Sequence, residues 1–308
     1  MNSCRSRFKS VAILLSTYNG SKYIDTQLDS LFAQQLDDNY HVDIIVRDDG
    51  STDDTVLKLL QYEAKGQIRL IQGSNVGVVA SFVELIDLIG NDYDYVALCD
   101  QDDRWHTGKI RRAIQAIDLK DCNLPVLYAS EYVFCDENLN KVANSHLCKN
   151  DVSFYKLLYE NVISGNTIVM NRALHGLLSG RGKEHVYCHD WWIALVASSL
   201  GEVIFDRDYY SLDYRRLGDN ASATGRGRGA ILKNRVRRFI HDDGLDCVTG
   251  QLVKLVQEYE DLLPIQYAED LSLFLHSNRL KKVFFPKRLR QTVAGEVCVR
   301  LLFLLGRL

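Results

Sequence analysis

The sequence lacks the features that mark several common classes of protein. Its eight cysteines are scattered, and no two form a Cys-x-x-Cys pair. A structural zinc site or a small disulfide-stapled scaffold is therefore not expected, and the isolated thiols fit a reducing cytosol. No apolar run reaches the roughly 18 residues that a membrane-spanning helix needs. Near the N-terminus the only apolar run is the short VAILL, so no signal peptide is expected.

A large net charge is also missing. The formal charge is −3 over 308 residues, which argues neither for nor against a nucleic-acid partner, and none is expected. Its distribution is more informative, because from residue 279 onward a single acid, Glu296, faces eight basic residues. These are Arg279, Lys281, Lys282, Lys287, Arg288, Arg290, Arg300 and Arg307. The remainder of the chain is correspondingly acidic.

The first hundred residues alternate between short apolar runs and helical stripes. SVAILL, VDIIV, IRLI and YVALC each precede a polar turn, and amphipathic segments separate them. This order predicts an α/β, Rossmann-like domain with a mostly parallel sheet flanked by helices. Right-handed crossovers place the carboxyl ends of such strands at one edge, where open α/β sheets bind ligands.

The pattern loosens after about residue 123 and changes again near residue 225. The stretch 202–216 is rich in strand-forming residues, whereas the segment after Gly225 is basic and punctuated by glycine. Residues 247–282 read as helical. We therefore expect a nucleotide-binding domain over residues 1–225 and a basic helical region over residues 226–308.

Three aspartates follow the predicted buried strand that ends at Cys99. Asp100, Asp102 and Asp103 stand within four positions, and like charges this close raise the cost of ionising one another. Mg²⁺ and Mn²⁺ prefer oxygen ligands and often bridge a carboxylate to substrate phosphates. A solvated acidic turn or a helix N-cap would use the same residues, so this motif alone leaves the choice open.

Two further polar turns end predicted strands. STYNG offers Tyr18 for stacking on a nucleobase and Ser16, Thr17 and Asn19 for hydrogen bonds. RDDGSTDDT offers a carboxylate for a base N–H or a ribose hydroxyl, although helix capping explains some of its acids. Taken singly, each turn is explained better by local structure. All three polar turns should nevertheless meet in one crevice.

In their order and spacing, LLSTYNG, RDDGSTDDT and LCDQDDRW resemble the inverting family 2 glycosyltransferases, which have the GT-A fold. The pairing of DQDDRW with a later HDWW resembles the bacterial subgroup labelled rhamnosyltransferases. The resemblance covers roughly residues 9–220. It implies an enzyme that moves a sugar from a nucleotide donor to an acceptor, with inversion and with Mn²⁺ or Mg²⁺ as cofactor.

The resemblance also implies a role for each matching residue. The nucleotide pocket would be lined by Ser16, Thr17, Tyr18, Asn19, Asp49, Asn75 and Gly77. Asp100 and Asp102 would hold the metal, with Asp102 the better candidate. The donor sugar or the acceptor would lie near Asp103, Gly165 and Asn166.

CHDWW supplies the candidate base. An inverting transfer needs one group to take the proton of the acceptor hydroxyl, and Asp190 matches the family's catalytic aspartate. From its position alone, Asp190 could equally cap a helix. Trp191 and Trp192 are candidates for the donor sugar or acceptor site, and we expect one to face a sugar and the other to pack in the core. His189 is expected to be structural.

YRRLGDNAS supplies candidate diphosphate contacts. Arg215 and Arg216 carry guanidinium groups, which suit phosphate oxygens. The family often has a histidine where this chain has Leu217, so no histidine contact is carried over there. A second departure is the stretch 106–108, HTG, where the family often has a proline. That departure changes the turn rather than the chemistry.

The tail combines KRLR with VCVRLLFLLGRL. Such a helix can lie in an anionic membrane interface or pack on the domain with a solvated basic face. We expect peripheral contact with the inner face of the plasma membrane, because a lipid-linked glycan acceptor would be presented there.

The expected donor is dTDP-β-L-rhamnose by subgroup resemblance, and the acceptor a bacterial surface polysaccharide or a lipid-linked glycan. A UDP-hexose or UDP-N-acetylhexosamine donor is the alternative. A non-catalytic sugar-binding module would not need Asp190. A dinucleotide oxidoreductase would need G-x-G-x-x-G after the first strand, which STYNGSK lacks.

Overall fold

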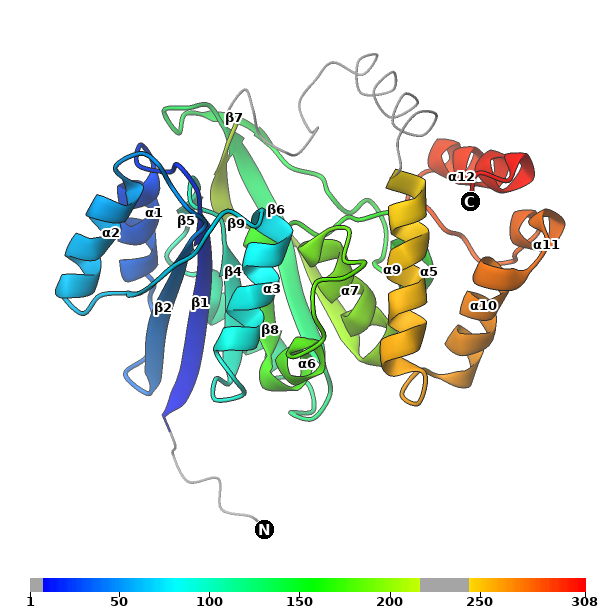
Figure 1. The fold of residues 1–308 in the computed structure, drawn as a ribbon, viewed down its shortest axis with the longest axis horizontal. Helices are drawn as coiled ribbons and strands as arrows, with labels where there is room; N and C mark the ends of the chain where they lie inside the picture. Colours follow the sequence, from blue (N-terminus) through cyan, green and yellow to red (C-terminus); the bar gives the residue numbers. More distant parts are fainter. Residues whose placement is uncertain (1–7, 217–243) are drawn as a thin grey trace, which may run out of the picture.

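A computed structural model describes residues 8–216 and 244–308 (Figure 1). The strands found there are β1 Lys9–Thr17, β2 Tyr40–Asp48, β3 Arg69–Gln72, β4 Tyr95–Cys99, β5 Arg104–Trp105, β6 Val126–Cys135, β7 Lys141–Asn144, β8 Val169–Asn171 and β9 Glu202–Arg215. The α-helices found there are α1 Ile24–Phe32, α2 Thr55–Ala64, α3 Val78–Leu88, α4 Lys109–Ile117, α5 Phe154–Leu157, α6 Arg172–Leu178, α7 His189–Leu200, α9 Gly244–Tyr259, α10 Ile265–His276, α11 Arg279–Val283 and α12 Val293–Leu305. Leu217 and the domain boundary expected near residue 225 lie outside these ranges.

The described strands form one sheet of nine strands in the order β3-β2-β1-β4-β8-β6-β9-β5, with β7 paired to β6. β3, β2, β1 and β4 run parallel, as predicted, while β8 lies antiparallel between β4 and β6. The α/β class is therefore confirmed, with a sheet that is mixed beyond β4. Leu15 pairs with Cys99 and Thr17 with Asp48, so the turns after β1, β2 and β4 meet at one edge.

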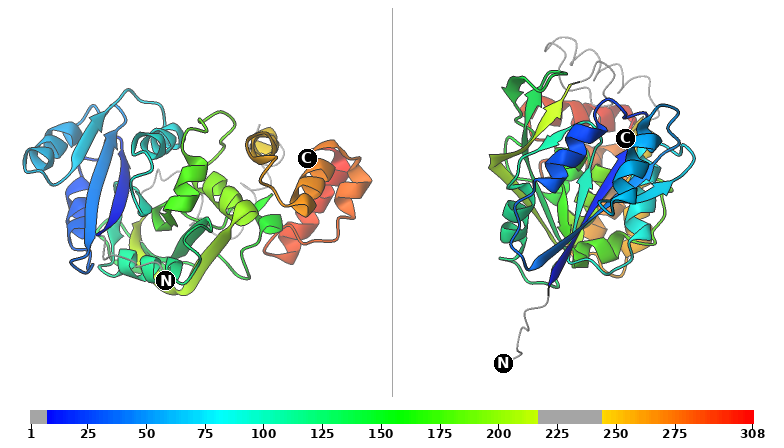
Figure 2. Two further views of the ribbon diagram at one scale, coloured as in Figure 1. Left: turned by 90° about the horizontal axis from the view of Figure 1, so that it is seen from below. Right: turned by 90° about the vertical axis from the view of Figure 1, so that its left-hand side faces the viewer.

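Both faces of the central strands are buried. Along β1, Ala12 and Leu14 join one apolar cluster, while Val11, Ile13 and Leu15 join another on the opposite face. Apolar residues of α3, α6 and α7 complete the first cluster, and those of α1, α2 and α4 complete the second. The helices flank the sheet on its two sides (Figure 2). This two-sided burial explains why the strands read as continuous apolar runs.

The C-terminal helices continue the first cluster. Leu252, Leu255 and Tyr259 of α9 are buried together with Trp192 of α7, and Phe274 of α10 packs with Phe303 of α12. None of the helices within the described ranges has the length and apolarity needed to cross a bilayer.

The stretch DQDDRW continues into a strand that the sequence pattern does not reveal. Arg104 and Trp105 form β5, which pairs antiparallel with β9 through Asp213 and Leu212. The Trp105 amide also donates to Ser30 Oγ of α1 at 3.0 Å. The aspartates of the motif therefore lie on a short link between β4 and β5, held at both ends by the sheet.

A buried histidine makes the fold sensitive to acid. His175 on α6 is 1% exposed, and its Nε2 donates to the Ile86 carbonyl at 2.9 Å. Burial lowers the pKa of His175 below its usual 6.5. As the pH falls below 6.5, the unfolded chain binds a proton that the folded chain resists, so this residue's contribution to stability is lost.

We expect His175→Gln to reduce the loss of unfolding free energy between pH 7.5 and pH 5.5, measured by urea denaturation. Groups that titrate alike in the variant and the wild-type protein contribute equally to both losses, so their contribution cancels in the comparison. Equal losses in the two proteins would show that His175 is not responsible.

Candidate active site

Gln101 joins the turns that follow β1 and β4. Its Oε1 accepts hydrogen bonds from Thr17 Oγ1 at 2.6 Å and from the Tyr18 amide at 2.9 Å, while its Nε2 donates to the Tyr18 carbonyl at 3.1 Å. Gly20 packs so closely that an added Cβ would lie 2.2 Å from Gln101 Oε1. Gln101, for which the sequence offers no role, therefore joins the turn STYNG to the turn CDQDD through hydrogen bonds.

Asn19 joins the turn after β1 to the turn after β2. Its amide donates to Ser51 Oγ at 2.8 Å, and its Oδ1 accepts from the Thr52 amide at 2.8 Å. Its φ of 49° lies in the left-handed region, which asparagine tolerates better than most residues. Tyr18 is 44% exposed, and its ring has no hydrogen bond within the described residues. Asn19 thus holds the turns after β1 and β2 together at the sheet edge, while the Tyr18 ring is available for stacking.

Asp49 is buried at the end of β2 and holds the loop between β3 and α3. Its carboxylate accepts from the amides of Val76 and Gly77, each at 2.9 Å, and pairs with Arg47. Gly77 has a φ of 83°, in the region that favours glycine. Asn75 is exposed on this loop. Asp49 therefore positions the loop, and a direct contact with base or ribose stays a prediction.

Arg47 extends this arrangement to the first strand. Its guanidinium pairs with Glu84 at 2.8 Å and donates to Ser81 Oγ at 3.3 Å. Ser81 Oγ lies 2.7 Å from Ser16 Oγ, so Ser16 belongs to a hydrogen-bonded network that reaches α3. No role for Arg47 is expected from the sequence, because two of its partners, Ser81 and Glu84, lie 34 and 37 positions away.

The three aspartates after β4 lie close to one another; Asp103 is buried, and Asp100 and Asp102 are half-buried. Burial, followed by the charges of Asp102 and Asp190, raises the pKa of Asp100 to about 7. Burial also raises the pKa of Asp102. Asp103 is fully buried, and burial and then the charges of Asp102 and Asp100 raise its pKa well above the usual range. The site therefore carries negative charge that the fold leaves incompletely compensated.

Asp100 and Asp102 have the properties expected of cation ligands. Within the described residues, neither carboxylate accepts a hydrogen bond from another residue. Nor do any three His, Cys, Asp or Glu side chains there form a group able to hold a metal ion by themselves. Mg²⁺ and related ions are commonly bound through one or two carboxylates, with substrate phosphates and water as the other ligands. These two carboxylates fit such an ion, whereas Asp103 is already bonded to the protein.

Asp103 connects the aspartate link to the second half of the sheet. Its carboxylate accepts from Asn166 Nδ2 at 2.5 Å and from the Arg215 amide at 3.2 Å. Asn166 is 1% exposed and begins the stretch that leads into β8. Asp103 and Asn166, both predicted near the sugar, are thus brought together but bonded mainly to each other.

A fully buried lysine lies beneath the aspartates. Lys109 Nζ donates to the Asn166 carbonyl and lies 3.2 Å from the centre of the Trp105 ring. Burial lowers the pKa of Lys109 to about 7, against the opposing charges of Cys99, Asp103 and Asp100. Lys109 is not among the residues predicted from the sequence, although a lysine on the buried side of α4, among isoleucines, is a detectable anomaly.

Asp190 lies in the first turn of α7, and Cys188 rather than Asp190 is the N-cap residue. Its carboxylate accepts from Asn161 Nδ2 at 3.0 Å and from the Gly165 amide at 3.2 Å. An added Cβ on Gly165 would lie 2.8 Å from His189 Nε2, so only glycine permits this approach. His189 itself is buried and stacks on Phe82 with ring centres 4.3 Å apart.

The two arginines after β9 have different surroundings. Arg215 is 5% exposed, and its guanidinium donates to the carbonyls of Asp102, at 2.9 Å, and Glu137. It therefore supports the backbone of the link between β4 and β5. Arg216 lies with its guanidinium carbon 3.9 Å from the centre of the Phe134 ring. Contact of either arginine with a diphosphate stays a prediction.

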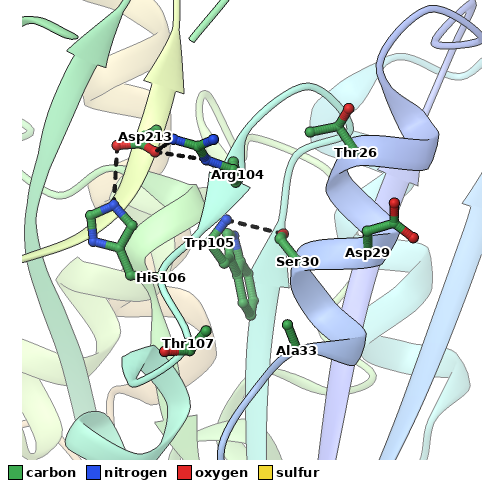
Figure 3. A pocket seen from close by; sticks show the side chains of 9 residues that line it. All are labelled: Thr26, Asp29, Ser30, Ala33, Arg104, Trp105, His106, Thr107 and Asp213. Carbon is green, nitrogen blue, oxygen red and sulfur yellow. Dashed lines mark hydrogen bonds and ion pairs between the residues drawn. The ribbon is translucent and has the colours of Figure 1, made fainter. Parts of the chain in front are cut away.

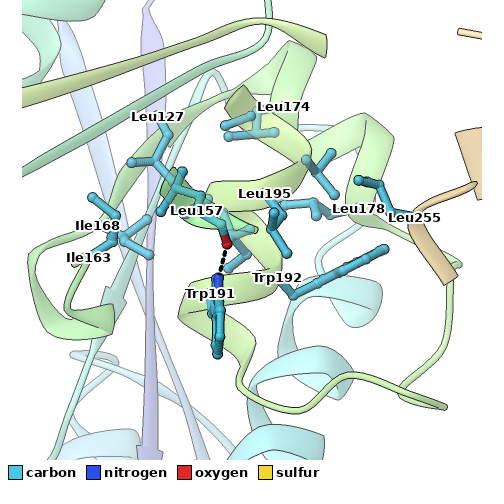
Figure 4. Close-up of a cluster of buried hydrophobic side chains, with 14 of the residues drawn as sticks. Leu127, Leu157, Ile163, Ile168, Leu174, Leu178, Trp191, Trp192, Leu195 and Leu255 are labelled. Atoms are coloured by element: carbon cyan, nitrogen blue, oxygen red, sulfur yellow. Dashed lines mark hydrogen bonds between the residues drawn. The ribbon is translucent and has the colours of Figure 1, made fainter. Parts of the chain in front are cut away.

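Both tryptophans of HDWW lie in the core (Figure 4). Trp191 is 7% exposed and donates from Nε1 to the Leu157 carbonyl at 2.5 Å, and Trp192 is 3% exposed against Tyr259 of α9. The expectation that one of them faces a sugar is therefore wrong. The reason is that Tyr259 of α9 packs against Trp192, while Trp191 is held by its hydrogen bond to Leu157 and its contact with Tyr187.

A groove of about 570 Å³ lies between α1 and the β5 region, and Arg104, His106 and Asp213 are among the residues that line it (Figure 3). Arg104 donates to Asp213 Oδ2 at 2.5 Å, and His106 Nε2 lies 3.1 Å from Asp213 Oδ1. Burial alone would raise the pKa of Asp213, but His106 and Arg104 hold it below its usual 3.8. His106, in the stretch that departs from the family pattern, thus ties β5 to β9.

The fold is that of the GT-A class. TarS 1–349 from S. aureus, in complex with UDP, superposes with a TM-score of 0.56 at 16% identity over 90% of this chain and 75% of that one. The mannosyltransferase PcManGT from Pyrobaculum calidifontis, in complex with GDP-Man and Mn²⁺, gives 0.53 at 16% identity over 96% and 74%. At this identity the likeness establishes the fold alone.

The chain belongs to glycosyl transferase family 2, whose sequence profile matches residues 12–175. It is 33% identical to the dTDP-rhamnosyl transferase RfbG of Shigella flexneri over 114 residues, which is 35% of this chain and 38% of that protein. It is also 26% identical to the uncharacterized protein Rv1520 of Mycobacterium tuberculosis over 166 residues, 53% of this chain and 47% of that protein. The match therefore spans less than half of either relative.

We expect Lys109→Met to lower the free energy of unfolding by about 1–3 kcal/mol at pH 8, because the buried Asn166 carbonyl would lose its hydrogen-bond donor. The matched control is Lys120→Met, which breaks a half-exposed pair with Glu202 and should cost less than about 1 kcal/mol. Urea denaturation without added metal measures both. Equal losses would mean that the buried Lys109 amino group contributes no more to stability than a half-exposed ion pair does.

Proposed function

We propose that this protein is an inverting, metal-dependent glycosyltransferase that moves a sugar from a nucleotide donor to a glycan acceptor. The observation that carries the proposal is that the Gly165 amide donates to Asp190 at 3.2 Å while the neighbouring Asn166 donates from Nδ2 to Asp103 at 2.5 Å. The candidate base therefore lies beside the link that carries the candidate metal ligands, although 90 positions separate Asp190 from Asp100 in the chain. Family membership supports the same reaction class.

The nucleotide would lie along the edge where β1, β2 and β3 end. The exposed Tyr18 ring would stack on the base, and the loop with Asn75 and Gly77, held by Asp49, would border the ribose. The internal hydrogen bonds of Thr17 and Asn19 would keep this edge in shape before the donor binds. Preorganisation of this kind reduces the entropy lost on binding.

Asp100 and Asp102 would hold Mg²⁺ or Mn²⁺ next to the donor diphosphate, with Asp102 the better candidate for direct contact. A bound cation would supply charge stabilisation for the diphosphate as it leaves. Arg215 would keep the Asp102 carbonyl in place, and Arg216 would contact the diphosphate.

Asp190 would act as the general base. It would take the proton of the acceptor hydroxyl while that oxygen forms a bond to the anomeric carbon. The bond between this carbon and the diphosphate oxygen would break on the opposite face, and its electron pair would leave with the nucleotide. Donors from Asn161 and Gly165 hold the carboxylate in one orientation, which aligns it for this transfer.

The donor we propose is dTDP-β-L-rhamnose, which would give an α-linked rhamnoside. The similarity to a dTDP-rhamnosyl transferase supports this choice. A UDP-hexose or UDP-N-acetylhexosamine is the alternative, since the structure of TarS 1–349 has also been solved with UDP-GlcNAc. The acceptor would be a surface polysaccharide, such as an O-antigen or capsule, or a lipid-linked precursor at the cytoplasmic face of the membrane.

A non-catalytic module that binds nucleotide sugars or glycans is the rival from another class. Such a module needs the donor edge but not an aspartate held by three hydrogen-bond donors beside the candidate metal ligands. Release of nucleotide from the donor in the presence of acceptor would decide for the enzyme.

We expect Asp190→Asn to lower the transfer rate by about 10²–10⁴-fold while leaving donor affinity within about twofold, because only the proton acceptor is lost. Asp102→Asn should instead abolish metal-dependent donor binding. Calorimetry measures donor binding, and an assay of product formation measures transfer. The control is Asp261→Asn, which changes an exposed acid. Near-full transfer by Asp190→Asn would overturn the base assignment.

We expect dTDP-rhamnose to raise the thermal unfolding midpoint when Mn²⁺ is present and not when EDTA replaces it. Binding to the folded state alone stabilises it by mass action, so the shift reports affinity. UDP-glucose and UDP-N-acetylglucosamine complete the panel. If only a UDP-sugar raises the unfolding midpoint, that UDP-sugar is the donor. If no nucleotide sugar raises it, the proposed function is contradicted.

A further inference from the structure

The exposed side of α12 is apolar along its whole length. Val293, Val297, Leu301, Leu304 and Leu305 are 71%, 54%, 52%, 49% and 68% exposed. Their spacing of three or four positions places them on one side of the helix. We call these five residues the α12 stripe. Within the described ranges no side chain covers this stripe, and solvent-facing helix sides are normally polar.

The opposite side of α12 is fixed to the protein. Val299, Leu302 and Phe303 are at most 8% exposed, and Phe303 packs against Phe274 of α10. The stripe therefore is not a core-facing surface that has lost its partner. The neighbouring α11 adds two further exposed apolar residues, Leu280 at 58% and Phe284 at 79%.

The border of this apolar surface is positively charged. Exposed basic residues lie on α11, on the segment that leads to α12, and beyond its end: Arg279, Lys281, Lys287, Arg288 and Arg307. The single acid after residue 278 is Glu296, which pairs with Arg300 at 2.6 Å and accepts from the Leu289 amide at 2.8 Å. No exposed carboxylate therefore offsets the charge of this part of the chain within the described residues.

We propose that the α12 stripe and its basic border dock on the surface of an anionic lipid bilayer. An apolar helix side enters the boundary between headgroups and acyl chains, while lysine and arginine contact anionic phosphates. A second copy of this chain fits less well, because a symmetric pairing through the stripe would bring two basic borders together. The positive charge of the border therefore favours an anionic lipid surface over a second copy of this chain.

α12 and the proposed nucleotide site lie apart along the longest axis of the molecule. In Figure 1, β1 and β2 lie at the left and α12 at the upper right, and the carboxyl ends of β1 and β2 are directed to the same upper side. This inference deepens the membrane contact in the proposed function, but the contact itself depends on neither donor nor reaction.

The test is sedimentation of the full chain with vesicles of phosphatidylcholine alone or with one third phosphatidylglycerol. We expect binding to the anionic vesicles, and at least about tenfold weaker binding by Leu301→Gln/Leu304→Gln, because two large apolar side chains no longer enter the interface. The matched control is Leu57→Gln/Leu119→Gln, at sites 62% and 84% exposed on other helices or loops, which should bind as the wild-type protein does.

Lys287→Glu/Arg288→Glu should weaken binding to anionic vesicles by at least about fivefold for each reversed charge, and added salt should act in the same direction. Undiminished vesicle binding by the stripe variant would overturn the proposal. So would a dimer, measured by light scattering, that the stripe variant dissociates. Donor-dependent thermal shifts should be unchanged in both variants, so failure of the docking proposal can be told apart from failure of the proposed function.

Discussion

Burial of the carboxylates after β4, together with their mutual repulsion, is the constraint on which the site depends. Asp103 is fully buried and Asp100 and Asp102 are half-buried, and burial raises the pKa of all three. The fold compensates only in part. Lys109 lies below them, and Asn166 and the Arg215 amide bind Asp103. The remaining charge on Asp100 and Asp102 is the property that a divalent cation with a diphosphate would use.

The second half of the sheet brings the candidate base to this charge. β8 lies antiparallel beside β4, and the short turn at Gly165 just before β8 contacts the start of α7. The lack of a side chain at Gly165 lets its amide reach the Asp190 carboxylate. The candidate base and the link that carries the candidate metal ligands are thus joined through the two adjacent residues Gly165 and Asn166.

The C-terminal helices have two distinct relations to this domain. α9 completes the apolar cluster that buries Trp192, so it contributes to packing around the candidate base helix. α12 is fixed through Phe303 but presents its other side outward. α12 is therefore apolar on both its buried side and its exposed side. An ordinary surface helix instead has polar residues on the side that faces water.

The sequence by itself determined the α/β class, the parallel order of the early strands and the meeting of STYNG, RDDGS and CDQDD at one edge, because parallel strands with crossover helices leave no other arrangement. Only the tertiary structure decided which side chains compensate the charges there. Gln101 and Lys109 bind partners more than fifty positions away, and Arg47 joins its neighbour Asp49 to Ser81, 34 positions away; no local pattern encodes these distant contacts. The burial of Trp192 likewise depended on α9, more than fifty positions later in the chain.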